Sequence, residues 1–379
     1  MGRQGAGGAV PVSEPVVLHV GKVSGISGSE NHLLLLLPAL RGHGIDARFV
    51  LLHEDEPGAM EFGRRLAGAG VPVEAIRLPH PADVRAYRRL VATIRRQRPP
   101  IVHTHLVHAD FLGLTAARLC RVPVLVSTKH GFNAFRESRA FATADRTVGR
   151  LATRQIAISH GLARYLAQTE GFREDAFTVI HYGIEPGPEP PPYAGSAPRL
   201  LCIGRLVPIK GHDVLLQAFA QARDAVPALE LALAGAGPLE VELRRRVVEL
   251  QLESSVRFLG LVSPVGPELE SAAIVVVPSL GEGFGMVALE AMERGRAVIA
   301  SDVGGLPEIV ADSRTGLIVP RSDADALAAA IVRLAADLPR AAALGEAGRT
   351  RAVAEFGQDR CTRQTAELYE AALARAGRS

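Results

Sequence analysis

The stretch GIEPGPEPPPYAGSAP, residues 183–198, decides how this chain divides. Proline and glycine at this density favour a linker over a helix or a strand. Short apolar runs rich in β-branched residues precede and follow it, and helix-like segments separate these runs. The stretch therefore predicts two folded units of similar size, one on each side of it.

The same alternation of strand and helix occurs in both halves. The strand-like runs are 15–20, 47–52, 101–105, 123–128, 155–159 and 177–181 before the linker, and 199–204, 229–235, 256–260, 273–278, 297–301 and 316–320 after it. This order predicts parallel sheets that are covered by helices on both faces. Ligands bind beyond the carboxyl ends of the strands in such sheets, so two facing domains would form a cleft.

We therefore predict an α/β protein made of two Rossmann-like, doubly wound domains. The expected segments are a flexible tail (1–14), an N-terminal domain (15–185), the linker (186–198), a C-terminal domain (199–356) and a last helical segment (357–379).

Composition excludes several classes of protein. The 379 residues are 47% hydrophobic and 22% charged, as in ordinary globular proteins. The net charge of +3 gives no general attraction to nucleic acid, so no nucleic-acid partner is expected. The three cysteines are far apart and form no CxxC pair, which fits a cytoplasmic protein without a disulfide framework.

The segment SLGEGFGMVALEAM (279–292) reads as a glycine loop that leads into a helix near Met286. The free N–H groups at that helix start can hold a phosphate, and Gly283 and Gly285 allow close backbone approach. Glu282 and Glu290 could accept hydrogen bonds from sugar and ribose hydroxyls. The alternative is that Glu282 is a turn residue and Glu290 a solvated helix residue.

Two basic residues flank another loop that follows a strand, in CIGRLVPIKG (202–211). Arg205 and Lys210 would suit a pyrophosphate and could stabilise a leaving diphosphate, unless they simply face solvent. The glycine loops at 21–30 and 235–238 lack the glycine spacing of a dinucleotide-binding fingerprint, so a nicotinamide-dependent dehydrogenase is not supported.

Histidines gather near the expected strand ends, in HTHLVH (103–108) and at His130. A metal site is one interpretation of HTHLVH. Asp110 is the only acidic residue close by, so polar histidines at the edge of a cleft are the favoured alternative. His130 precedes Gly131, where its side chain would point into the cleft.

The segment 83–99 reads as a basic amphipathic helix. Val84, Tyr87, Val91 and Ile94 share one face, and six arginines cover much of the rest. Such a helix can bind an anionic membrane surface, which would place the protein at the inner face of the membrane. The alternative is a solvated surface helix.

Taken together, the motifs resemble those of the retaining, nucleotide-sugar-dependent glycosyltransferases of GT-B architecture in glycosyltransferase family 4. The motifs are G-R-L-x4-K-G (204–211), G-x-G-P (235–238), E-G-F-G (282–285) with the second glutamate at 290, SDVGGLPEIV (301–310) and TGLIVP (315–320). The resemblance covers almost the whole chain, and five motifs in this order are highly specific.

The resemblance implies a UDP- or GDP-sugar donor bound by the C-terminal domain and a hydroxyl acceptor on the N-terminal side. The implied donor-binding residues are Arg205, Lys210, Gly235, Gly237, Glu282, Gly283, Phe284, Gly285, Met286, Val287 and Glu290. In this assignment Arg205 and Lys210 hold the diphosphate, and Glu290 binds the ribose. The implied catalytic residues are His130, Glu282, Arg205 and Lys210.

Further implications concern the N-terminal loop, the last helix and metals. Gly25, Ser27 and Gly28 would lie near the diphosphate and acceptor, although the family's Gly-Gly-x-Glu reads Ser-Gly-Ser-Glu at 27–30. The last helix would cross back onto the N-terminal domain. The family needs neither metal nor cofactor, and Glu282 would hold the sugar and not attack it. Alternatives are a catalytically silent nucleotide-sugar-binding partner and a nucleotide-sugar epimerase of the same architecture.

Overall fold

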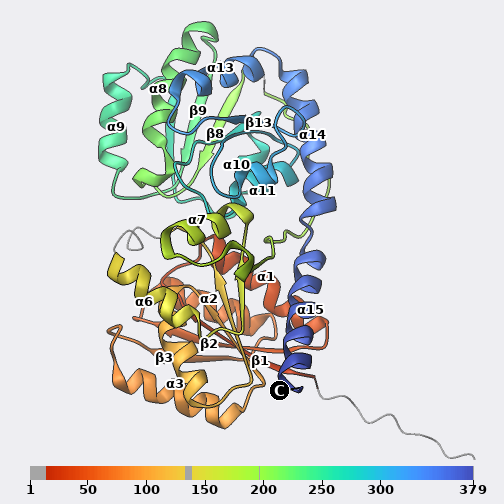
Figure 1. Ribbon diagram of the computed structural model, residues 1–379. Coiled ribbons are helices and arrows are strands. Elements are labelled where there is room, and N and C mark those ends of the chain that lie inside the picture. The colour runs from red at the N-terminus through yellow and green to blue at the C-terminus, as the bar shows by residue number, and fades with distance from the viewer. Residues whose placement is uncertain (1–13, 133–138, 196, 379) are drawn as a thin grey trace, which may run out of the picture.

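The computed structural model describes residues 14–132, 139–195 and 197–378, so the predicted tail lies outside it except for Glu14. Two parallel sheets form two domains that lie one above the other (Figure 1). The first sheet has seven strands in the order β3-β2-β1-β4-β5-β6-β7, and the second has six in the order β10-β9-β8-β11-β12-β13. This architecture confirms the predicted fold of two doubly wound domains.

The elements alternate along the chain as the sequence predicts. The N-terminal domain contains β1 (Val16–Lys22), α1 (Gly28–Gly42), β2 (Asp46–His53), α2 (Pro57–Gly68), β3 (Val73–Arg77), α3 (Val84–Gln97), β4 (Ile101–His105), α4 (Val107–Ala109), α5 (Thr115–Leu119), β5 (Val124–Lys129), α6 (Arg139–Gly149), β6 (Arg154–Ala157), α7 (His160–Glu170) and β7 (Phe177–Val179). The second part contains β8 (Arg199–Ile203), α8 (His212–Ala225), β9 (Glu230–Ala234), α9 (Glu240–Glu249), β10 (Val256–Gly260), α10 (Gly266–Glu270), β11 (Ile274–Val277), α11 (Met286–Glu293), β12 (Ala297–Ser301), α12 (Leu306–Ile309), β13 (Leu317–Val319), α13 (Ala324–Ala335), α14 (Leu338–Glu355) and α15 (Gln358–Ala376).

Central strands are continuous apolar runs because helices cover both faces of each sheet. All four residues of β11 are buried, and so are all five of β12. Edge strand β3, which the sequence analysis missed, has the sequence VEAIR and buries only Ile76. Glu74 and Arg77 break the apolar run that marks the central strands, so the sequence signal of this strand is weak.

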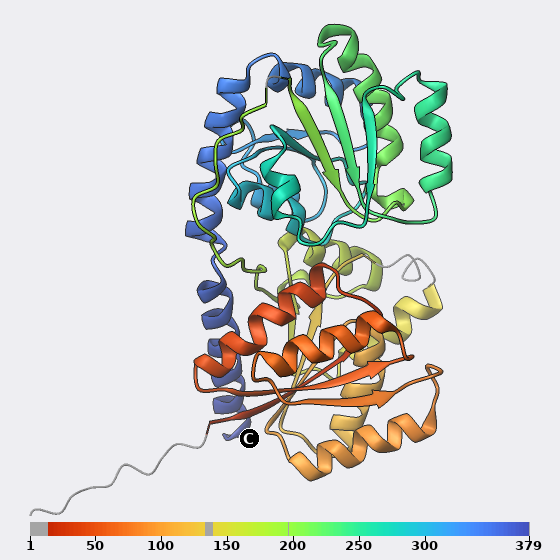
Figure 2. The same ribbon diagram turned by 180° about the vertical axis from the view of Figure 1, so that it is seen from behind.

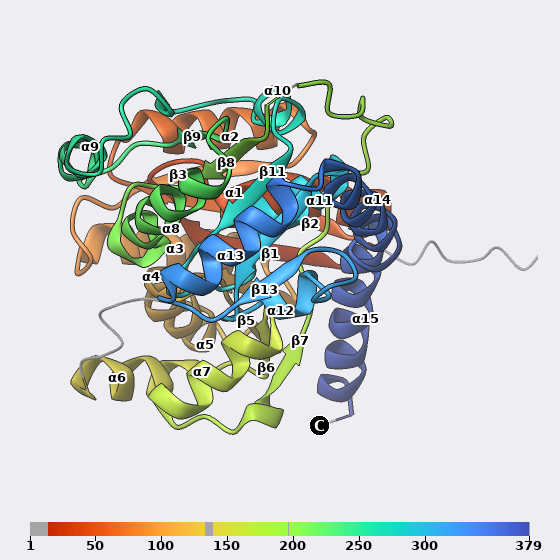
Figure 3. The same ribbon diagram turned by 90° about the horizontal axis from the view of Figure 1, so that it is seen from above.

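The last two helices connect the domains. Helix α14 covers the C-terminal domain, and α15 packs against α1 and β5 of the N-terminal domain (Figures 1 and 2). Viewed from above, both helices lie at the same edge of the molecule (Figure 3). The chain also passes from one domain to the other at Ile184, which lies beside the junction of α14 and α15. The N–H of Ile184 donates to Phe356 O (2.9 Å), and its carbonyl accepts from Gln358 N (2.9 Å).

The proline-rich linker follows the surface of the C-terminal domain. Glu293 accepts a hydrogen bond from Gly187 N (2.8 Å), and Arg349 donates to Gly187 O (2.9 Å). Arg296 donates to Pro191 O (2.7 Å). None of the helices within the described ranges combines the length and the apolar character that crossing a bilayer demands.

Candidate active site

A cleft of about 440 Å³ lies between the two domains, beyond the carboxyl ends of strands from both sheets. From the N-terminal domain it is lined by Ser27, Gly28, His130, Gly131, Phe132 and Tyr182, among others. From the C-terminal domain it is lined by Arg205, Lys210, Gly235 and every residue from Gly281 to Val287. The cleft therefore gathers most of the residues that the sequence analysis selected.

Three selected residues do not line this cleft. Gly25 lies in the loop before α1, and Gly237 packs beneath the loop that carries Arg205. Glu290 is half-buried on α11, where burial and the neighbouring Glu293 raise its pKa to about 7. The predicted roles of these three residues in donor binding stay predictions.

The glycine loop brings the N-terminus of α11 to the cleft. Gly285, at φ +117°, precedes the helix, and a Cβ there would lie 2.6 Å from the Leu306 side chain. Glycine is thus required both by the backbone angle and by the packing. Met286 and Val287 line the cleft, so the unpaired N–H groups of the first helical turn lie at its wall.

The cationic residues of the C-terminal wall differ in their partners. Lys210 Nζ lies 2.5 Å from Glu282 Oε2, and the two side chains are 24% and 17% exposed. Arg205 is exposed and makes no ion pair with any residue in the described parts of the chain. One cation is therefore partly neutralised by Glu282, and the other is available to an anion.

Close backbone packing holds the loop of Arg205 in place. A Cβ at Gly235 would lie 1.9 Å from Gly204 O, and one at Gly237 would lie 2.4 Å from Leu206 O. Leu206 N donates to Ala236 O (3.0 Å) and Leu239 N to Leu206 O (3.1 Å). The G-x-G-P motif thus positions the cationic loop, whatever contact Gly235 makes with a ligand.

On the N-terminal wall, α1 also directs its N-terminus at the cleft. The Glu30 carboxylate accepts hydrogen bonds from Ser27 N (3.0 Å) and Ser29 Oγ (3.0 Å), so it satisfies donors of this first turn. Gly28 lies opposite Met286, close enough that an added Cβ would be 3.6 Å from Met286 Cγ. The two helix starts therefore face each other across the cleft.

His130 lines the cleft, but its imidazole is turned towards its own domain. Nδ1 is hydrogen-bonded to the Tyr182 hydroxyl, and Nε2 lies 3.0 Å from His105 Nδ1. Burial lowers the pKa of His130 to about 3, so the ring is neutral at physiological pH. With both nitrogens occupied and a depressed pKa, His130 is poorly suited to act as a general base.

Contacts that the sequence analysis missed join the domains beside the cleft. Glu308 of α12 accepts hydrogen bonds from His160 N (3.0 Å) and Gly161 N (2.7 Å) at the start of α7, and lies 2.8 Å from His181 Nε2. Ser159 Oγ donates to Gly283 O (2.6 Å). Glu308 lies within the quoted motif 301–310, which was the available signal.

Comparisons with known proteins agree with this geometry. Residues 27–183 match the family model "Glycosyl transferase 4-like domain", and residues 197–337 match "Glycosyl transferases group 1". The chain is 32% identical over 306 residues to the alpha-maltose-1-phosphate synthase of Mycolicibacterium smegmatis, covering 71% of this chain and 78% of that protein. It is 38% identical over 164 residues to the GDP-mannose-dependent alpha-(1-6)-phosphatidylinositol monomannoside mannosyltransferase of the same organism, covering 41% and 43%.

Among solved structures, the Anabaena protein HepE in complex with UDP and glucose superposes with a TM-score of 0.83 at 21% identity. The match covers 94% of this chain and 100% of HepE. This likeness shows the fold, and the sequence relatives show the family. The chain therefore belongs to glycosyltransferase family 4 and is a glycosyltransferase with the GT-B fold.

Proposed function

We propose that this glycosyltransferase moves a hexosyl unit from a UDP- or GDP-sugar to a hydroxyl acceptor and retains the anomeric configuration. The observation that carries the proposal is the composition of the C-terminal wall. An exposed arginine, a lysine held by one glutamate and the open N-terminus of α11 line one side of a cleft. These groups suit a diphosphate flanked by a sugar.

Donor binding would change the partner of Lys210. In the free protein its ammonium is paired with Glu282 at 2.5 Å. A diphosphate beside Lys210 would compete for that cation, and Glu282 would then accept hydrogen bonds from hydroxyls of the donor sugar. The ion pair thus keeps both residues in place until the donor replaces it.

The chemical step breaks the bond between the anomeric carbon and the diphosphate oxygen. Negative charge develops on the leaving diphosphate, where Arg205, Lys210 and the α11 N–H groups stabilise it. The diphosphate then takes the proton of the acceptor hydroxyl as that oxygen attacks from the same face. We propose that these fixed protein charges suffice without a metal ion.

Two nucleotides are compatible with the relatives. The similar mannosyltransferase is named as GDP-mannose-dependent, and HepE was solved with UDP. A panel of α-linked UDP- and GDP-sugars, incubated with and without EDTA, tests the proposal through slow donor hydrolysis. Proton NMR of the first sugar released should show the α-anomer, with a rate that EDTA leaves unchanged.

Other outcomes of the same experiment would overturn parts of the proposal. Initial release of the β-anomer would contradict retention, and loss of the rate in EDTA would contradict metal independence. Release of a sugar epimerised at one carbon would identify an epimerase. Tight donor binding without any turnover in the presence of candidate acceptors would favour a silent binding protein.

We also propose that α3 contacts an anionic membrane surface. The arginines of α3 and of the residue that follows it are all exposed: Arg85, Arg88, Arg89, Arg95, Arg96 and Arg98. Val84, which shares a face of the helix with Tyr87 and Val91, is 60% exposed, and Leu119 in the same surface hollow is 56% exposed. Val84 is the first residue of the helix, and the residues of α3 that the core buries begin at Ala86.

An exposed apolar pair with Arg88 and Arg95 beside it suits the headgroup region of a membrane. Flotation with vesicles containing anionic lipid tests this, comparing wild type with an Arg85→Glu, Arg88→Glu, Arg89→Glu variant. We expect wild type to float and the variant to stay at the bottom of the gradient. Equal flotation of the two proteins would remove the proposal.

A further inference from the structure

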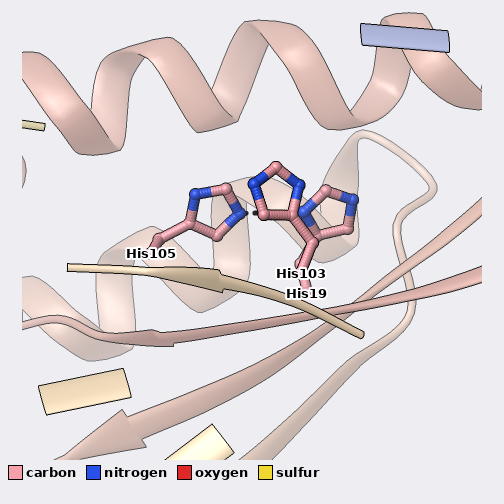
Figure 4. A group of neighbouring side chains, drawn as sticks. All are labelled: His19, His103 and His105. Carbon is pink, nitrogen blue, oxygen red and sulfur yellow. Dashed lines mark hydrogen bonds between the residues drawn. The ribbon is translucent and has the colours of Figure 1, made fainter. Parts of the chain in front are cut away.

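A cluster of histidines lies directly behind the cleft in the N-terminal domain. His19 on β1 is paired with His103 on β4, and His105 follows two residues later on the same face of the sheet. Figure 4 shows the three side chains next to one another. Each of them is buried, with at most 1% exposed. This face of the sheet therefore holds polar rings where a core normally holds apolar residues.

Hydrogen bonds join four side chains in one series: His19, His105, His130 and Tyr182. His19 Nδ1 lies 2.9 Å from His105 Nε2, and His105 Nδ1 lies 3.0 Å from His130 Nε2. His130 Nδ1 is hydrogen-bonded to the Tyr182 hydroxyl. The hydrogen-bonded series thus begins in the centre of the domain at His19 and ends at the cleft wall.

The two ends of this hydrogen-bonded series differ, and the difference decides which nitrogen of each ring carries the proton. A neutral imidazole has one donor and one acceptor nitrogen, so the proton position on one ring fixes that on the next. The Nε2 atom of His19 is buried without a partner among the described residues. An unpaired buried N–H is rarer in proteins than an unpaired acceptor, so the proton of His19 belongs on Nδ1.

The remaining proton positions follow from that one. His19 Nδ1–H donates to His105 Nε2, so His105 carries its proton on Nδ1 and donates to His130 Nε2. His130 in turn carries its proton on Nδ1 and donates to the hydroxyl oxygen of Tyr182, whose own hydroxyl hydrogen is left for a partner in the cleft that this residue lines. Burial lowers the pKa of both His19 and His130 to about 3, in agreement with neutral rings throughout.

A metal ion is the competing explanation for three buried histidines. Two nitrogens bound to one tetrahedral zinc ion would be separated by about 3.3 Å, given Zn–N distances near 2.0–2.1 Å. The observed 2.9 Å between His19 and His105 instead suits a direct N–H···N hydrogen bond. His103 already uses Nδ1 for the Tyr369 hydroxyl (2.6 Å) and Nε2 for Thr128 Oγ1 (2.7 Å).

We infer that His105, oriented by His19, is a positioning residue that holds the imidazole of His130 in its Nδ1–H tautomer. The backbone of His130 packs against the donor loop, since a Cβ at Gly283 would lie 3.0 Å from His130 O. A fixed ring therefore fixes the main chain that faces Glu282 and its neighbours. The inference rests on the proposed function only for its effect on catalysis, not for the tautomer itself.

The direct test is the tautomer of His130 in the substrate-free protein, read from long-range ¹H–¹⁵N correlations after selective histidine labelling. We expect the proton on Nδ1 in the wild type. His105→Asn keeps an N–H donor at the same distance from the backbone and should keep this tautomer. His105→Asp offers only an acceptor and should move the proton of His130 to Nε2, lowering kcat about tenfold with little change in donor KM.

Controls make the outcomes distinct. His32→Phe removes another buried histidine, which stacks on Tyr182 but is not a member of the hydrogen-bonded series. The His130 tautomer should therefore be unchanged in this variant. An Nε2–H tautomer in the wild type, or an Nδ1–H tautomer in the Asp variant, would overturn the inference. So would stoichiometric zinc in the isolated protein measured by mass spectrometry. Because no substrate is present, failure here is distinguishable from failure of the proposed function.

Discussion

Two lysines beside the cleft illustrate how its two walls differ. Lys129 ends β5 in the N-terminal domain and lies between Asp110 (2.7 Å) and Asp145 (3.1 Å), with all three side chains 0% exposed. Lys210 follows β8 in the C-terminal domain, is 24% exposed and is paired with Glu282. The first lysine is enclosed by its counterions, whereas the second remains accessible to a ligand.

This difference assigns separate tasks to the walls. The N-terminal wall holds Lys129, Asp110 and Asp145 in a buried network, here called the closed network, which lies one residue from the neutral ring of His130. The C-terminal wall exposes Arg205 and leaves Lys210 accessible. We interpret the first wall as a fixed support and the second as the surface that meets the diphosphate.

The largest expected effect concerns the closed network. Lys129→Met would leave two buried carboxylates without their shared cation, at a cost of about 3–5 kcal/mol in the free energy of unfolding. Urea denaturation of the variant measures this loss. A change below about 1 kcal/mol would mean that the network does not support the wall as proposed.

The corresponding change in the open wall should act on catalysis instead. Lys210→Met removes a cation from the developing charge of the leaving diphosphate, so kcat/KM should fall about 10²–10³-fold. The free energy of unfolding should change by less than about 0.5 kcal/mol, because the pair is partly solvated. A large loss of stability with intact activity would reverse the comparison.

A backbone contact within the C-terminal wall gives an intermediate effect. Gly304, at φ +55°, lies so close to Glu282 O that an added Cβ would be 1.5 Å from it. Gly304→Ala should therefore displace the loop of Glu282 and lower the stability by about 1–3 kcal/mol together with donor affinity. Gly44→Ala is the matched control: its φ is +75°, but no atom lies within 4 Å of the added Cβ.

Only the backbone penalty should appear in the Gly44 variant, with donor affinity unchanged. Equal effects of the two substitutions in calorimetry and thermal unfolding would show that the contact with Glu282 does not matter.

The ionisation of Glu290 predicts a smaller, pH-dependent effect. Its pKa of about 7 in the folded protein lies above the ordinary value of 4.5 for a glutamate, mainly through burial and secondarily through Glu293. The group therefore favours the folded state below pH 4.5, and this contribution is lost as the pH rises through about 7. The difference in the free energy of unfolding between Glu290→Gln and the wild type should thus favour the variant more at pH 8 than at pH 5.

If Glu290 binds ribose hydroxyls as a carboxylate, donor affinity should also fall about tenfold for each pH unit below its pKa. The Gln variant should show no such dependence. Titration of a donor between pH 5.5 and 8 measures both proteins, and parallel profiles would remove Glu290 from the site.

The smallest expected effect concerns Glu308, whose contact between the domains weakens at low pH. Burial alone would raise its pKa, but hydrogen bonds from His181, Gly161 and His160 leave it lowered overall. The stabilisation is therefore present above the unfolded-state pKa and is lost as the pH falls through the lower folded-state value. Glu308→Gln should remove this acid-dependent step in thermal unfolding, while a wild-type profile in the variant would contradict it.

The sequence predicted the two domains well because each central strand is a continuous apolar run. It also predicted the cleft residues, since glycine loops and paired cations follow those strands. It could not predict the hydrogen-bonded series of histidines, because β1 and β4 are separated by two other strands in sequence. His19 comes next to His103 only when these two strands pair. The contact of Glu308 with α7 likewise depends on how the domains meet.

The partners of Lys129 were also hidden from sequence reasoning. Asp110 was noted only as a lone acid beside HTHLVH, and Asp145 lies on α6, far along the chain. A buried ion pair between distant residues leaves no periodic pattern. In contrast, Lys210 was recognised because its loop carries a motif of fixed spacing.

The central claim is that the C-terminal wall binds the diphosphate of a nucleotide-sugar. Isothermal titration of UDP and GDP into wild type, Arg205→Ala and Lys210→Ala tests it, with uridine and guanosine as controls that lack the diphosphate. We predict that at least one diphosphate binds the wild type and that each substitution weakens it by about tenfold or more, with weak nucleoside binding unchanged. Unchanged affinity for the diphosphates in both variants would contradict the account.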